Sequence, residues 1–349
     1  MQRPVMNPMF LEADAEPASP ARRHRLLFSP IGLISRIMLA DVCFWRSARQ
    51  LQIEDASPLA RIFRGLLYRL LFVPVVLACV VIALVYLGTH PPRVTSMLDP
   101  LSQGTYYDPI SFVSEDGLRL DGWLVPLLDA KIVLQKREQA LRIKSPAVIL
   151  VHDYGTNRTQ MLPLVQPLHD AGYIVFVISL RGSGGMTAAG CTFGLRERAD
   201  VQGAIDVLRR RPGVDANRIA VLGMGTGANA ALLAAEHDPK VAALILDHAV
   251  IHVDQMISDR ISPPQPWLQW LRPICKWTFE IAYRVDTEDL DIQRRSAGLA
   301  SCPVLMFDSS AIPSQCFRPS GIQEIRDFLG KHLPATIENS AAIEVKEMK

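Results

Sequence analysis

The sequence has almost no net charge, because its 37 lysines and arginines are balanced by 35 aspartates and glutamates, which leaves +2. This balance excludes the strongly basic surface with which nucleic-acid-binding domains neutralise phosphates, so we expect no nucleic-acid partner. Disorder of the whole chain is also excluded, since 49% of the residues are hydrophobic and 21% are charged. At 349 residues the chain has room for one large α/β domain or two smaller ones.

A recognisable cysteine pattern is missing as well. Cys43 and Cys79 fall in or before a long apolar run, and the other four cysteines follow it, at Cys191, Cys275, Cys302 and Cys316. These four allow three disulfide connectivities, and their spacing selects none of them. Buried free thiols are an equally good interpretation.

Charge is absent from nineteen consecutive residues, Leu70 to Gly88. A helix of this length spans about 28 Å, close to the roughly 30 Å hydrocarbon core of a bilayer. Few soluble helices are apolar on every face over such a length, so we predict a transmembrane helix over residues 66–89; a buried core helix is the alternative. A cleaved signal peptide fits less well, because no A-x-A pattern follows the run.

Arginine is concentrated before this run, where ten arginines and six acidic residues precede residue 70. The positive-inside rule therefore predicts a single-pass protein with residues 1–65 in the cytoplasm and the C-terminal domain outside it, in the periplasm if the source is bacterial. Residues 1–24 are polar and are expected to be disordered. Residues 25–50 mix apolar residues with arginines and are interpreted as an interfacial amphipathic segment, although a cytoplasmic partner helix would look the same.

Beyond a linker at residues 90–104, the pattern predicts one α/β domain over residues 105–335 and a flexible tail over 336–349. A hairpin is expected around Glu115 to Gly117, followed by a charged stretch at residues 127–145 that could form a short surface helix. Buried strands then alternate with amphipathic helices, which calls for a mostly parallel central sheet with helices on both faces. The expected strands are 147–155, 173–185, 218–223, 241–249 and 303–307, and the expected helices are 160–171, 195–213, 225–236 and 321–333.

An insertion of about fifty residues, 250–299, separates the last two strands and contains Trp267, Trp270 and Trp277. Its place beside the carboxyl edge of a parallel sheet is typical of a lid over a binding site. A helical packing insert is an equally good interpretation.

Three motifs occur together in a characteristic order: "VILVHDYGTNR" (148–158), "LRGSGG" (180–185) and "ERADVQGAIDVLRRRPGVDANRIAVLGMGTGA" (197–228). In this order they resemble the α/β-hydrolase fold, in particular its dienelactone-hydrolase and acyl-peptidase-like branch. The resemblance covers about residues 105–333. It implies a serine nucleophile on a tight turn after the third of the strands, with an acid and a histidine on later loops.

The catalytic positions that the resemblance implies are altered in this chain. The turn keeps its flanking glycines, Gly223 and Gly227, but Gly225 stands at the nucleophile position and has no Oγ. Ile312 stands at the acid position. Asp308 comes about four residues early and is interpreted as a strand-terminal cap, with a shifted acid as the alternative. The segment from Cys316 to Gly321, where the family has its histidine, contains none.

The oxyanion turn departs from the family pattern as well, because His152-Asp153 replaces His-Gly. In the family the backbone N–H of the residue at position 226 binds the oxyanion. Two unit charges about 4 Å apart repel by roughly 4 kcal/mol at an effective dielectric constant of 20, so a carboxylate here would oppose an oxyanion. Alternatively, Asp153 pairs with Arg158 or Arg181.

A displaced catalytic site is a second hypothesis. Thr226 would be the nucleophile, with His248 or His252 as the base and Asp247 to orient it; alternatively, the Thr226 side chain caps the following helix. A metal site formed by His152, Asp153, His248 and His252 lacks a known ligand spacing, and "GMGTGA" lacks the acidic partner of a dinucleotide site. We therefore expect neither a metal nor a cofactor.

Taken together, these features predict a degenerate hydrolase domain, a pseudoenzyme, that serves as a membrane-anchored binding or interaction module. An apolar small molecule such as an acyl chain, held under the tryptophan-containing insertion, and a protein are both candidate partners besides the bilayer. Two alternatives stay open. One is an active ester or amide hydrolase that uses the displaced site, and the other is a plain anchor for a partner of the cytoplasmic segment.

Overall fold

The computed structural model describes residues 58–92, 96–127, 144–183, 189–250, 252–287, 295, 299, 302–307 and 314–335. Several predicted features lie outside these residues, namely the segments 1–24 and 25–50, most of the stretch 127–145, Asp308, Ile312 and the tail 336–349. By its internal contacts the chain divides into two compact units, Met1–Ala83 and Leu84–Lys349.

The apolar run belongs to one long helix, α3 (Pro58–Thr89). Within it, the 25 residues Gly65–Thr89 are long and apolar enough to cross a membrane, since they extend about 37 Å. The helix begins well before residue 66 and contains the whole predicted span. Pro58 opens it, at a position where the missing N–H costs nothing.

The C-terminal unit is built on a sheet in the order β1-β2-β4-β3-β5-β6-β7. The antiparallel hairpin of β1 and β2 forms one edge, with its turn at the predicted place, and β2 runs antiparallel to β4, whereas β4, β3, β5, β6 and β7 are parallel to one another. The predicted α/β fold is thus confirmed. The strands are β1 (Asp108–Val113), β2 (Arg119–Val125), β3 (Ser145–Val151), β4 (Ile174–Ile178), β5 (Val214–Met224), β6 (Ala243–Asp247) and β7 (Val304–Phe307).

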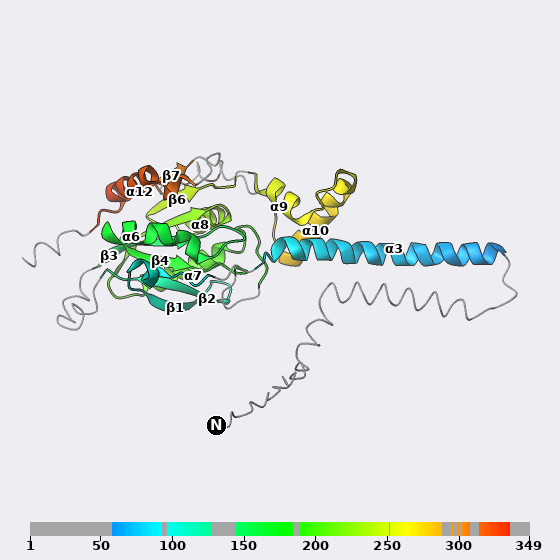
Figure 1. Ribbon diagram of the computed structural model, residues 1–349, viewed down its shortest axis with the longest axis horizontal. Coiled ribbons are helices and arrows are strands. Elements are labelled where there is room, and N and C mark those ends of the chain that lie inside the picture. Colours follow the sequence, from blue (N-terminus) through cyan, green and yellow to red (C-terminus); the bar gives the residue numbers. More distant parts are fainter. Residues whose placement is uncertain are drawn as a thin grey trace, which may run out of the picture. The chain divides into compact units, whose positions relative to one another are not determined.

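Helices cover both faces of this sheet (Figure 1). On one face lie α6 (Leu162–Asp170) and α12 (Pro319–His332), and on the other lie α7 (Arg198–Arg209) and α8 (Thr226–His237). Three short 3-10 helices, η1 (Pro100–Gln103), η2 (Arg158–Met161) and η4 (Gln315–Phe317), complete the connections described. This two-faced cover explains why the parallel strands read as continuous apolar runs.

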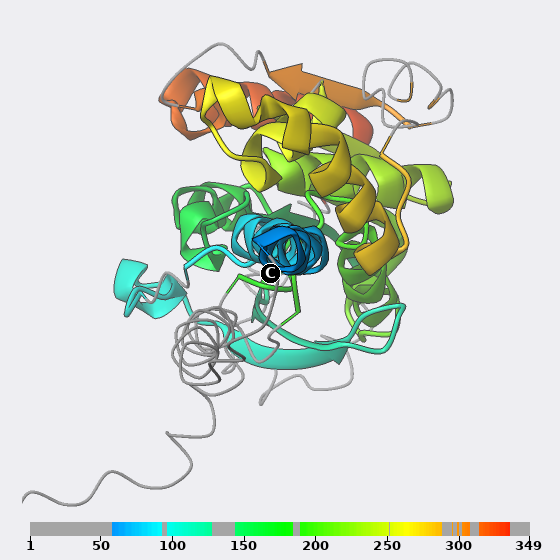
Figure 2. The same cartoon turned by 90° about the vertical axis from the view of Figure 1, so that its right-hand side faces the viewer.

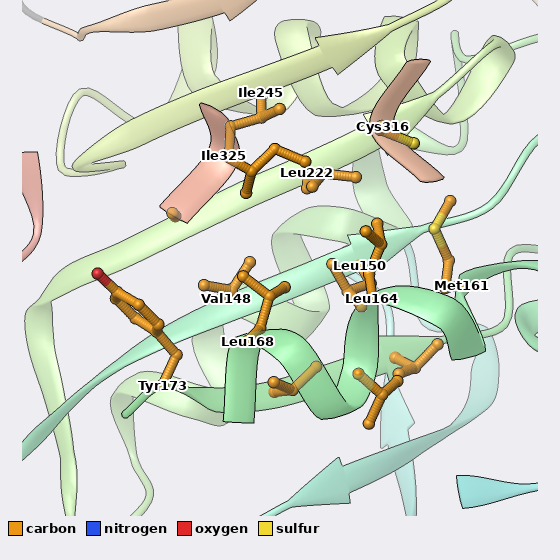
Figure 3. Close-up of a cluster of buried hydrophobic side chains, with 14 of the residues drawn as sticks. Val148, Leu150, Met161, Leu164, Leu168, Tyr173, Leu222, Ile245, Cys316 and Ile325 are labelled. Atoms are coloured by element: carbon orange, nitrogen blue, oxygen red, sulfur yellow. The ribbon is translucent and has the colours of Figure 1, made fainter. Parts of the chain in front are cut away.

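Alternate residues of the strands form the core between the sheet and the helices α6 and α12. Val148 and Leu150 of β3 point to this face together with Leu222 of β5, and they pack against side chains of both helices (Figure 3). Ile149 and Val151 are also fully buried, because the opposite face is covered by α7 and α8.

The predicted insertion begins with three helical segments: α9 (Val253–Ile261), η3 (Pro266–Leu271) and α10 (Arg272–Tyr283). The helices α9 and α10 pack on each other (Figure 2). All the cysteines of the described residues, from Cys79 to Cys316, are free thiols.

Candidate functional site

The tight turn after β5 has the geometry of a strained elbow. Gly225 separates the last residue of β5 from the first of α8 and has φ 55° and ψ −120°, a conformation that strongly favours glycine. Its N–H donates to the Asp247 carbonyl oxygen at 2.9 Å, which ties the turn to β6. Gly223 and Gly227 lie so close to neighbouring backbone that neither has room for a Cβ. The chain therefore retains the turn that presents a nucleophile in the fold it resembles.

The side chain of Asp153 occupies the space beside Gly225. A Cβ built on Gly225 would come well inside 3.0 Å of the carboxylate carbon and of both carboxylate oxygens of Asp153. A serine at this position and the present Asp153 conformation are therefore mutually exclusive.

The Asp153 carboxylate is held there by hydrogen bonds from the start of α8. Its Oδ1 accepts the backbone N–H of Thr226 at 2.7 Å and the Thr226 hydroxyl at 3.2 Å, and it also accepts the N–H of Tyr154 at 2.6 Å. The N–H at position 226 is the donor that the family resemblance assigns to an oxyanion. In this chain the Asp153 carboxylate accepts that N–H in place of an oxyanion.

Two side-chain interpretations drawn from the sequence are wrong. Thr226 does not cap α8, because the cap residue is Gly225 and the Thr226 hydroxyl binds Asp153 instead. Asp153 pairs with neither predicted arginine. Arg158 contacts Asp121, and Arg181 binds Asp116 and Asp200.

His152 binds the backbone next to the turn through both ring nitrogens. Its Nε2 accepts the backbone N–H of Leu180 at 3.1 Å, so Nδ1 carries the proton and donates to the Asp153 carbonyl oxygen at 2.8 Å. Burial lowers the pKa of His152, because the charged form would lose its hydration. The two ring nitrogens thus connect the backbone of Leu180 to that of Asp153, and the imidazole is neutral.

A second polar cluster lies at the carboxyl end of β6. The fully buried carboxylate of Asp247 contacts His248 Nδ1 at 2.8 Å and accepts the hydroxyl of Ser314. His248 has a left-handed backbone, with φ 52°. The predicted neighbour His252 is exposed at the start of α9. The structure thus joins Asp247 to His248, whereas the Thr226 hydroxyl binds Asp153.

Aromatic side chains cover the region next to the elbow. Tyr154, Phe193, Phe279 and Tyr283 form a continuous series, with successive ring centroids 5.0, 6.1 and 5.1 Å apart. The Tyr154 hydroxyl donates to the Gly88 carbonyl oxygen at 2.6 Å, and that of Tyr283 to Thr89 Oγ1 at 2.9 Å. The last turn of α3 is therefore fastened beside the candidate site.

Sequence reasoning missed Tyr154, Phe193 and Ser314. Tyr154 directly follows the altered oxyanion pair, and Ser314 lies in the segment "FDSSAIPSQ" that aligns with the family's acid loop, so both positions carried a local signal. Phe193 gave none, because its role depends on rings from other elements.

Within the part of the chain that the structure describes, one pocket lies at the end of α10. Its volume is about 460 Å³, it is open to solvent, and Arg196, Ala282, Tyr283 and Arg284 line it. Two guanidinium groups suit an anionic group better than a purely hydrocarbon ligand. Among the described residues, no three His, Cys, Asp or Glu side chains are arranged to hold a metal ion.

Comparison with known proteins agrees with this architecture. Residues 144–297 match the model of the family described as serine aminopeptidase, S33. The esterase Pf2001 of Pyrococcus furiosus superposes with a TM-score of 0.50 at 19% identity, over 70% of this chain and 98% of the esterase. At this identity the likeness concerns the fold alone.

Curated relatives match a shorter part of the chain. The uncharacterized protein YfhR of Salmonella typhimurium is 31% identical over 128 residues, which are 37% of this chain and 40% of YfhR. The uncharacterized protein Rv2307c of Mycobacterium tuberculosis is 31% identical over 134 residues, or 38% and 42% of the two chains. The match thus spans about two fifths of each relative.

Proposed function

We propose that this protein, which belongs to the α/β-hydrolase superfamily, has lost serine-hydrolase catalysis and works as a membrane-anchored binding or interaction module. One observation carries the proposal: the Asp153 carboxylate lies where the side chain of a nucleophile at position 225 would be, and it binds the N–H of Thr226. An anionic intermediate at this turn would have to displace that carboxylate or lie against it, and either is unfavourable.

The membrane-anchoring part of the proposal is supported by α3, whose residues Gly65–Thr89 have the length and composition of a span. The excess of arginine before residue 70 favours a cytoplasmic N-terminus and an extracytoplasmic domain. Alkaline carbonate extraction of membranes tests the anchor, since a spanning chain stays in the pellet. Proteolysis of a C-terminal epitope tag, before and after the outer face is made accessible, tests the orientation.

The ligand of such a module is proposed from the pocket at the end of α10. Arg196 and Arg284 favour an anionic head, and Tyr283 offers an aromatic ring beside it. An acidic amphiphile or an acidic protein segment would fit this chemistry better than the bare acyl chain expected from the sequence.

Loss of catalysis is tested with the full chain in detergent, exposed to a fluorophosphonate probe and to p-nitrophenyl acyl esters. We expect neither labelling nor turnover above buffer. Thr226→Ala is compared with Thr278→Ala, whose hydroxyl binds the Ile274 carbonyl oxygen within α10. Labelling that disappears in Thr226→Ala and persists in Thr278→Ala would contradict the proposal.

The second candidate function is an ester or amide hydrolase with a displaced site, in which Thr226 works with Asp247 and with His248 or His252. The contact of 2.8 Å between Asp247 and His248 favours it, because a carboxylate that orients a histidine is part of such machinery. Turnover that is lost in His248→Ala and retained in His237→Ala, a change at an exposed histidine, would establish this candidate instead.

A further inference from the structure

The outer face of η3 and α10 is unusually apolar. Trp267, Trp270 and Trp277 are 74%, 57% and 64% exposed, and Ile281 is similarly open. Residues three apart eclipse in a 3-10 helix, so Trp267 and Trp270 share one side of η3. Trp277 and Ile281 are four apart and share one side of α10.

This face is not the one that packs on the domain. The buried side of α10 is provided by Cys275 and Phe279, which follow Leu271 at four-residue steps. The helix therefore carries apolar side chains on two faces, one against the protein and one open. The partner helix α9 is different, because Asp254, Asp259 and Arg260 stand on its exposed side. Large exposed apolar patches on a folded protein mark a contact surface.

The end of α3 contacts the same insertion. A Cβ on Gly88 would lie 2.7 Å from the Arg260 carbonyl oxygen and 2.9 Å from the side chain of Ile261, so the last turn of α3 touches the end of α9. At the end of α10, Tyr283 donates to Thr89 Oγ1. The last turn of α3 thus contacts the insertion that carries the exposed tryptophans.

We propose that the outer face of η3 and α10 lies in the interface of the bilayer that α3 crosses, with Trp267, Trp270 and Trp277 at the level of the lipid headgroups. The inference rests on the membrane anchoring proposed above. Tryptophan favours this level because its ring is apolar and its N–H can remain hydrated. The insertion then holds the domain against the membrane.

The test uses the full chain with Trp45→Phe, in vesicles of phosphatidylcholine that carries bromine on the upper part of its acyl chains. Four tryptophans remain, and Trp123 is buried in the domain core. We expect the bromolipid to quench the emission of the other three. In the variant that also carries Trp267→Phe, Trp270→Phe and Trp277→Phe, this quenching is expected to be lost.

A matched control places a tryptophan on another exposed surface. Tyr106 is exposed and precedes β1, whose first residues pair with the end of β2 and so lie by the beginning of β4, at the amino edge of the sheet. Tyr106→Trp in the variant without the three tryptophans should stay unquenched by bromolipid.

Three results would overturn the inference. Equal quenching with and without the three tryptophans would place them outside the lipid, and quenching by aqueous acrylamide in place of bromolipid would assign them to water. A chain that floats with the vesicles and shows either result leaves the membrane anchor intact. A chain that does not float with vesicles overturns the anchor and this inference together.

Discussion

The contact between Asp153 and Gly225 predicts a strong energetic coupling between two residues that are distant in sequence. Asp153→Ala removes hydrogen bonds to a charged acceptor, each worth about 1.5–3 kcal/mol, and leaves the N–H of buried Thr226 without that partner. Gly225→Ala adds a Cβ at φ 55°, which costs about 1–3 kcal/mol in strain, and it must also expel the carboxylate.

These two costs overlap, because each change removes the same carboxylate contact. In the wild-type background we expect Gly225→Ala to cost about 2.5–6 kcal/mol, which is the strain plus the lost hydrogen bond from the Thr226 N–H to Asp153. In the Asp153→Ala background only the strain remains, about 1–3 kcal/mol. The double-mutant cycle should therefore give a coupling free energy of about 1.5–3 kcal/mol.

The assay is urea unfolding of the full chain in detergent, followed by tryptophan emission, for the wild type and the three variants. Gly330→Ala is the matched control, because a Cβ there meets nothing within 4 Å. Paired with Asp153→Ala it should be additive within about 0.5 kcal/mol. Additivity of the same kind for Gly225→Ala would refute the placement of the Asp153 carboxylate beside the turn.

Three further predictions follow from buried charges and thiols. Arg181→Met should lower the free energy of unfolding by about 3–5 kcal/mol, because the side chain is 1% exposed and its loss leaves the buried Asp200 carboxylate unpaired; a loss below about 1 kcal/mol would contradict this. The pKa of His152 is lowered in the folded state. Below about pH 6.5 the unfolded chain therefore binds a proton at this histidine more readily than the native chain does, and the free energy of unfolding decreases. Urea midpoints should thus fall on acidification, and less steeply in His152→Asn. Burial raises the pKa of the Cys302 thiol to about 11 and that of the Cys191 thiol well above its usual range. Since the thiolate is the reactive form, maleimide should modify neither cysteine in the native chain and both after unfolding, as measured by mass spectrometry.

The sequence alone determined the features that arise from local patterns. Apolar runs of strand length, amphipathic periods between them and the nineteen uncharged residues from Leu70 are properties of neighbouring residues, and the structure follows them. The three motifs, in their order, indicated the α/β-hydrolase fold through their resemblance to that family. The sequence also predicted a tight turn at Gly225, since such a turn requires small residues at fixed positions.

Only the tertiary structure decided which side chains meet. Asp153 and Thr226 are 73 positions apart and come together because β3 and β5 are adjacent parallel strands that end at the same edge. The sequence offered Arg158 and Arg181 as partners of Asp153 because opposite charges attract, but the fold commits them to Asp121, Asp116 and Asp200. The exposure of Trp267, Trp270 and Trp277 was equally invisible, since an apolar residue gives the same sequence signal whether it faces the core or the outside.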